Sequence, residues 1–178
     1  MTEAPVVETE TGKVAAGAGW FVLNLGAASW ARKGEFGVRC RFEAPNARFP
    51  EFGFGVHVLV PGQPNALYHS EAAQEGFLIL AGECLAVVEG RECSLRQWDY
   101  LHCPPGTAHV LVGAGDEPCA IAMIGAPRTS SLDEVSYPEN PVAARHGASV
   151  TRSTRSSREA YADRRADTSA EPAPWPIP

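Results

Sequence analysis

The sequence lacks the features that would place it in a membrane or in a disulfide-bonded secreted class. No apolar run approaches the roughly 18 residues that a membrane-spanning helix needs. Residues 1–13 are acidic and contain no basic stretch followed by an apolar one, so we expect a cytoplasmic protein with no membrane partner. The 5 cysteines are odd in number and form no C-x-x-C pair, which predicts free thiols and neither a zinc ribbon nor a disulfide framework.

The chain also lacks an excess of positive charge. Its formal net charge is −6, and the 14 acidic side chains of residues 1–126 outnumber the 8 basic ones. Residues 127–178 carry seven of each sign, with arginines interleaved among acids, which is typical of a solvated surface. Because an acidic body repels a phosphate backbone, we expect no nucleic-acid partner.

What the sequence does contain is a series of short β-rich runs broken by glycine and proline. Between Phe36 and Phe42, apolar side chains alternate with glycine and arginine, which is the pattern of a half-buried strand. Further runs span residues 56–60, 76–81, 84–89, 99–103, 107–113 and 119–125. Turn signals separate them, and no helical pattern intervenes, so the sequence predicts an all-β antiparallel sandwich or barrel.

We expect three parts along the chain. Residues 1–18 are polar and aperiodic and predict a loose N-terminal arm, residues 19–126 form the barrel domain, and residues 127–178 form a C-terminal extension. The extension is too poor in apolar residues to be a second domain. It contains Trp175 as an anchor, so we expect it to pack on the outside of the barrel.

Two short helices are predicted within the extension. Asn140 followed by Pro141, with Gly147 at the end, has the capping pattern of a short helix. Ser156 and Glu159 form a capping box, which predicts a second helix that extends to about residue 166.

The residues with chemical potential lie in two segments. His69 and Glu71 are two positions apart, so an extended backbone places their side chains on one face, and Glu75 follows after a short polar loop. His109 comes after a Pro-Pro-Gly turn in a later strand. Two imidazoles with one or two carboxylates on neighbouring strands are a plausible ligand set for a divalent metal, with room for water or substrate.

These segments resemble the two motifs of the cupin superfamily. The first motif runs histidine, any residue, histidine, three or four residues, glutamate, six residues, glycine. The positions that match it are His69, Glu75 and Gly82, with Glu71 in place of the second histidine. The second motif runs glycine, five residues, proline, any residue, glycine, two residues, histidine, three residues, asparagine. The positions that match it are Pro104, Gly106 and His109, with Trp98 in place of the opening glycine and Gly113 in place of the asparagine.

The resemblance covers residues 55–125 and implies a double-stranded β-helix, the jelly-roll cupin barrel, here with a short, partly helical C-terminal tail. It implies a metal site formed by His69, Glu75, His109 and, as a further ligand, Glu71. A set this rich in oxygen disfavours copper(I) and leaves iron, manganese, zinc or nickel as the divalent ion.

Structural roles remain open for each of these residues. The two histidines could be buried and hydrogen-bonded in a barrel without metal, Glu75 could cap a loop, and Glu71 could face solvent. His57 and His102 match neither motif and are interpreted as structural. Cys103, beside the Pro-Pro-Gly turn, is the thiol that we single out for possible reactivity.

For function, two hypotheses of different classes follow. The first is a metal-dependent cupin that binds a small-molecule ligand, with oxygenase, isomerase or lyase chemistry as the options. The alternative is a non-catalytic binding or sensing barrel without metal. The β-rich segment 20–43 lies outside the motifs and could cover an exposed sheet edge across a two-fold axis, so we also expect a homodimer.

Overall fold

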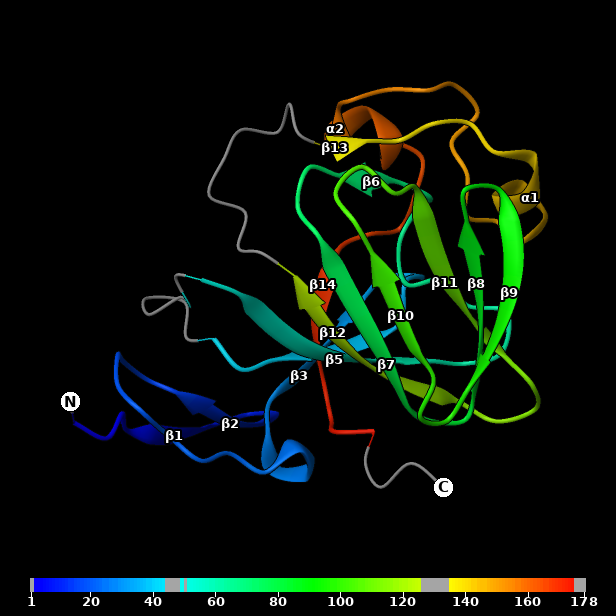
Figure 1. Ribbon diagram of the computed structural model, residues 1–178. Coiled ribbons are helices and arrows are strands. Elements are labelled where there is room, and N and C mark those ends of the chain that lie inside the picture. Colours follow the sequence, from blue (N-terminus) through cyan, green and yellow to red (C-terminus); the bar gives the residue numbers. More distant parts are fainter. Residues whose placement is uncertain (1, 44–48, 50, 126–134, 175–178) are drawn as a thin grey trace.

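The structure is a computed structural model that describes residues 2–43, 49, 51–125 and 135–174 (Figure 1). Its main sheet contains seven strands in the spatial order β10 (Tyr100–Cys103), β7 (Glu75–Ala81), β12 (Cys119–Gly125), β5 (Gly53–Leu59), β4 (Val38–Arg41), β3 (Trp30–Lys33) and β14 (Thr168–Glu171). A second sheet has the order β11 (His109–Ala114), β8 (Glu83–Val88) and β9 (Arg91–Arg96). Every named strand pair is antiparallel, and the fold is a double-stranded β-helix.

Alternation along the strands gives the main sheet two apolar faces. The inner face packs against the second sheet, and its buried cluster includes Phe77, Ile79, Leu111 and Ile121. The outer face carries a separate cluster around Trp30, which is 1% exposed. Ala28 of the N-terminal segment belongs to this outer cluster, and Leu23 and Leu25 pack against it.

The N-terminal residues differ from the loose arm that the sequence predicts. They form a hairpin of β1 (Val6–Thr9) and β2 (Gly12–Ala15), followed by a 3-10 turn, η1 (Leu25–Ala27). Isolated bridges also connect Glu3 with Trp20 and Lys13 with Ala28. The sequence did not predict this hairpin, because it is largely exposed on both faces and has no apolar alternation to reveal it.

The C-terminal extension packs against the barrel in the part that the structure describes. A small sheet pairs β13 (Val135–Ser136) with β6 (Ser70–Glu71), and β14 adds to the main sheet beside β3. Figure 1 shows the tail passing over the end of the barrel near β6 before it returns to the main sheet. Trp175, the expected anchor, lies outside the described residues.

Both predicted helices are present. α1 (Pro141–Arg145) begins after Asn140, whose side chain accepts hydrogen bonds from the backbone of Val142 and Ala143. α2 (Ser157–Ala160) begins after the Ser156 cap but ends at Ala160, earlier than expected. No helix in the described ranges is long and apolar enough to cross a membrane.

Candidate metal site at the barrel end

His69 and His109 face each other across an antiparallel bridge. The backbone amide of His109 donates to the carbonyl of His69 at 2.8 Å, and the amide of His69 donates back at 3.1 Å. Directly opposed residues project to the same face of a sheet, and the two ring centroids are 5.1 Å apart. The side chains are buried, with the residues only 8% and 1% exposed.

Backbone carbonyls fix the tautomer of both rings. His69 Nδ1 lies 2.7 Å from the carbonyl oxygen of Leu67, and His109 Nδ1 lies 3.0 Å from that of Thr107. A carbonyl oxygen can only accept, so each Nδ1 carries the proton and each neutral ring keeps a lone pair on Nε2. Metal-binding histidines in proteins are oriented by this type of hydrogen bond.

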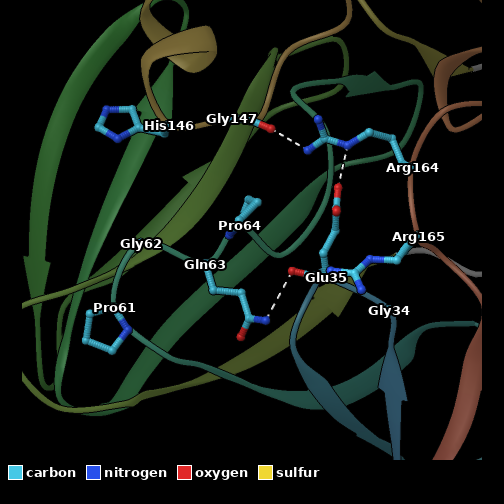
Figure 2. Close-up of a pocket in the computed structure, with 10 residues that line it drawn as sticks. All are labelled: Gly34, Glu35, Pro61, Gly62, Gln63, Pro64, His146, Gly147, Arg164 and Arg165. Carbon is cyan, nitrogen blue, oxygen red and sulfur yellow. Dashed lines mark hydrogen bonds and ion pairs between the residues drawn. The ribbon is translucent and has the colours of Figure 1, made fainter.

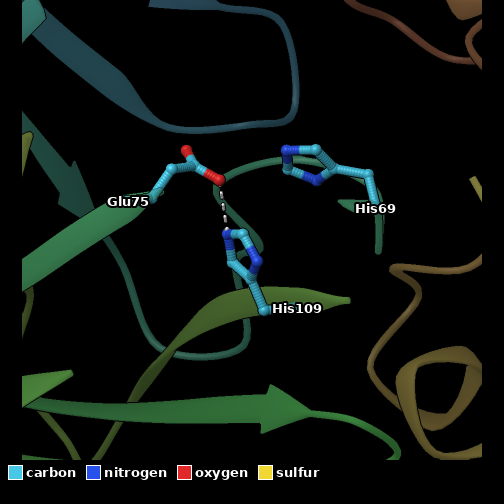
Figure 3. A group of neighbouring side chains, drawn as sticks. All are labelled: His69, Glu75 and His109. Atoms are coloured by element: carbon cyan, nitrogen blue, oxygen red, sulfur yellow. Dashed lines mark ion pairs between the residues drawn. The ribbon is translucent and has the colours of Figure 1, made fainter. Parts of the chain in front are cut away.

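Glu75 supplies the third group. It is the first residue of β7, and its carboxylate Oε2 lies 3.3 Å from His109 Nε2 (Figure 3). One ligand atom from each of His69, Glu75 and His109 lies within 4.8 Å of the other two. Donors with bonds of about 2.1 Å to one ion are about 3.0–3.4 Å apart at octahedral or tetrahedral angles, so a pair as far apart as 4.8 Å would have to approach by more than about 1 Å around a metal.

Glu71 lies beside this group. Its Oε1 is 3.6 Å from His69 Nε2, and its side chain is only 12% exposed. Glu71 therefore does not face solvent. It is not one of the three residues whose ligand atoms all lie within 4.8 Å of one another. Its position follows from β6, where Ser70 and Glu71 pair with β13 of the tail.

Burial sets the charge state of His109. Desolvation, and to a smaller extent the neighbouring His69, lower its pKa to about 4 although the Thr107 carbonyl opposes the shift. The ring is therefore neutral at pH 7. Its Nε2 is buried, and no described residue hydrogen-bonds to it.

A tyrosine that sequence reasoning did not place at the site forms one wall of it. Tyr137 follows β13, and its ring stacks on His69 with centroids 5.8 Å apart and an interplanar angle of 27°. Tyr161 contacts Tyr137 edge-on at 5.8 Å. Sequence reasoning missed both tyrosines, because nothing local signals that the tail returns over the motif histidines.

The other residues that the sequence singled out lie elsewhere. His102 is exposed on β10, away from the opposed histidine pair. His57 is on β5, and its Nδ1 is buried. Cys103 is buried, and desolvation together with the nearby Glu75 raises the pKa of its thiol to about 11, so the expectation of reactivity is wrong.

A pocket of about 530 Å³ lies between the barrel and the tail and does not include the histidine pair. Figure 2 shows its lining, in which Glu35 pairs with Arg164 at 2.5 Å and Gln63 donates to the carbonyl of Glu35. Arg164 also donates to the carbonyl of Gly147. These interactions hold the tail on the barrel, and the pocket is separate from the candidate site.

Comparison with known proteins agrees with this geometry. Residues 55–125 match the family model described as Cupin domain. No curated protein gave a significant match. The fold and the site together define a class of protein: a double-stranded β-helix with two histidines and a glutamate brought together at one end of the barrel. Residues 55–125, which carry both motifs, are therefore similar to cupin domains.

Solved structures with the same fold are distant in sequence. The polyketide cyclase RemF from Streptomyces resistomycificus has a TM-score of 0.53 at 12% identity, with 60% of this chain and 79% of that chain covered. A sugar phosphate isomerase of the cupin superfamily from Silicibacter pomeroyi has a TM-score of 0.50 at 19% identity, covering 65% and 85%. DMSP lyase DddQ from Ruegeria pomeroyi has a TM-score of 0.44 at 20% identity, and this chain spans 48% of its length. At these identities, the first two structures support the fold alone.

Proposed function

We propose that the protein is a metal-dependent cupin that binds one divalent ion through His69, Glu75 and His109 and a small metabolite next to it. One observation carries the proposal: the lone pair on His109 Nε2 lies 3.3 Å from a carboxylate oxygen. Two acceptors at this separation, one of them buried, repel each other unless a cation or a proton lies between them. A divalent ion bound by both atoms would remove this repulsion, and His69 supplies a third donor atom within 4.8 Å of the other two.

The chain's own residues would prepare this site before any ion binds. The carbonyls of Leu67 and Thr107 hold both rings with Nε2 toward the carboxylates, and Phe77 packs on the His109 ring with centroids 5.1 Å apart. The Tyr137 ring shields His69 from solvent. When bound, the ion supplies a Lewis acid that polarises a substrate oxygen.

Glu71 is proposed as a fourth ligand or as the proton-transferring group. Its carboxylate is near His69 but outside the three-residue group, so it could hold a proton at Oε1 while the other three side chains bind the ion. The reaction class stays among oxygenase, isomerase and lyase. The neighbouring structures include an isomerase, a cyclase and a lyase, and cupins support many chemistries on one fold.

Titration of the chelator-treated full chain with iron(II), manganese, zinc and nickel tests the proposal. We expect one equivalent of at least one ion to bind at micromolar concentration or tighter, and to raise the melting temperature by mass action. Absence of binding for all four ions, with a melt that a chelator leaves unmoved, would instead identify a metal-free binding barrel.

The role of Glu71 is tested by comparing Glu71→Gln with Glu75→Gln. Both substitutions keep the side-chain shape and remove the charge. If Glu71 is a ligand, both variants should lose more than tenfold in metal affinity. If Glu71 transfers a proton, only Glu75→Gln should lose affinity, and Glu71→Gln should bind metal as the wild type does.

The homodimer and the cytoplasmic location are part of the same proposal. The structure supports the location through its cysteines: all 5 are free, and 4 are buried. Unpaired buried thiols are typical of a reducing compartment.

A further inference from the structure

The inner face of the main sheet carries a cluster of basic side chains beyond the candidate metal site. Arg39 on β4 lies directly opposite His57 on β5, and His57 lies opposite Ile121 on β12, which belongs to the inner cluster. Opposed residues share a face, so Arg39 and His57 project to the same side of the sheet as Glu75 and Phe77. Lys33 and Arg41 lie close enough to His57 to lower its pKa together with Arg39.

A strip of glycines connects this cluster to the metal site, with the Glu43 carboxylate beside it: a Cβ at Gly53 would lie 3.4 Å from Glu43 Oε1. In the strand register, Glu75 is opposite Gly125, Gly125 is opposite Gly53, and the next inner position on β5 is Gly55, opposite Arg41. The floor between Glu75 and Arg41 is therefore bare backbone on two neighbouring strands. A Cβ at Gly125 would approach the Glu75 side chain at 3.5 Å, so any larger residue would fill this space.

Two of these basic groups, Arg39 and His57, lack a polar partner among the described residues. No described carboxylate forms an ion pair with Arg39, and desolvation lowers its pKa to about 10, with the charge of Arg41 adding to the shift. His57 Nδ1 is buried, and no group within the described residues hydrogen-bonds to it. A half-buried guanidinium without a counter-ion costs free energy unless an anion binds to it.

We infer that Arg39, with His57 and Arg41, binds the anionic group of the metabolite, a carboxylate or a phosphate, while the remainder of the metabolite crosses the glycine strip toward His69, Glu75 and His109. The planar fork of arginine suits either anion through two parallel hydrogen bonds. Tyr161 lies near Arg39 and contacts Tyr137, which stacks on His69, so one tail covers both subsites. The inference rests on the proposed function and specifies its substrate class as a small organic acid or phosphate ester.

Calorimetric titration with sodium malonate and with inorganic phosphate, at constant ionic strength, tests this subsite without knowledge of the metabolite. The full chain is used as purified and after chelation. We expect saturable binding of at least one of the two anions in both forms, and the tighter one identifies carboxylate or phosphate chemistry. Arg39→Gln should weaken the binding by roughly tenfold or more, since hydrogen bonds to charged groups contribute about 1.5–3 kcal/mol.

Three further variants make the result specific. Arg39→Lys keeps the charge without the fork and should bind more weakly than wild type but better than Arg39→Gln. His57→Gln should also weaken binding, and the exposed Arg91→Gln on β9 should bind as wild type does. Binding of neither anion to the wild type, or an equal loss in Arg91→Gln and Arg39→Gln, would overturn the inference. Metal binding without anion binding would refute this subsite alone, and anion binding without metal binding would refute only the metal proposal.

Discussion

Two imidazole nitrogens, His57 Nδ1 and His109 Nε2, are buried without a hydrogen-bond partner in the part of the chain that the structure describes. His109 was identifiable from the sequence because it completes a spaced motif after a Pro-Pro-Gly turn. His57 has no such motif, and its environment depends on the β4–β5 register, which places Arg39 opposite it. The register between two strands cannot be read from local periodicity. The position of Arg39 opposite His57 could therefore not be predicted from the sequence.

The two histidines make the stability of the metal-free protein depend on pH. Burial lowers the pKa of His57 to about 3 and that of His109 to about 4, against about 6.5 in the unfolded chain. Between pH 6.5 and 4 the unfolded chain therefore binds protons that the native chain does not. The free energy of unfolding should fall as the pH decreases through this window, by up to about 1.4 kcal/mol per pH unit for each histidine. Above the window both histidines are neutral in the native and in the unfolded chain, so they add no pH dependence.

Urea denaturation at several pH values in the presence of a chelator measures this effect. His57→Gln should reduce the slope between pH 6 and 5 by about half, because one of the two linked protonations is lost. A slope that is the same in the variant and the wild type would contradict the assignment.

Trp98 stands where the motif has glycine, and its backbone has φ +76°. This left-handed conformation costs a residue with a Cβ about 1–2 kcal/mol, and the side chain is 68% exposed and gains little from packing. Trp98→Gly should therefore raise the free energy of unfolding by about 1 kcal/mol. Tyr100→Gly, at a nearby exposed strand position, is the matched control and should be destabilising; stabilisation by both or by neither would contradict the argument.

At the scale of elements, the strands of the barrel were predictable where one face is buried. β5, β7, β8, β11 and β12 all carry runs of buried apolar residues. β9 was missed because it is exposed along nearly its whole length and reads as a polar connection. β14 was missed because its pairing with β3 joins segments more than 130 residues apart.

The cap of α1 gives a prediction for an element that sequence and structure both define. Asn140 Oδ1 accepts from the amides of Val142 and Ala143 at 2.9 and 3.0 Å, and Ala143 is fully buried against the barrel. Asn140→Ala should lower the free energy of unfolding by about 1 kcal/mol, and Asn140→Asp should retain most of it. Equal stability of wild type and Asn140→Ala in urea denaturation would show that the cap does not stabilise the docked helix.

At the scale of the whole molecule, the homodimer stays a prediction. The surface expected to form its interface, however, differs from the sheet edge that the sequence suggested. The edge of β3 is paired with β14 of the same chain, so segment 20–43 cannot cover a neighbouring sheet edge through β3. Trp20, Val22 and Phe52 remain exposed and apolar. Light scattering at micromolar concentration should give twice the 19.0 kDa chain mass, and Val22→Asp should shift it toward the monomer. A monomeric wild type would contradict the prediction.

The central claim is that the motif histidines and Glu75 bind a metal, and the metal content of two histidine variants tests it most directly. His109→Ala removes a buried donor that water replaces poorly, whereas His102→Ala removes an exposed histidine on β10. After loading and desalting, the account predicts about one equivalent of metal in the wild type and in His102→Ala, and a content far below stoichiometric in His109→Ala. Full occupancy in His109→Ala, or an empty wild type, would contradict it.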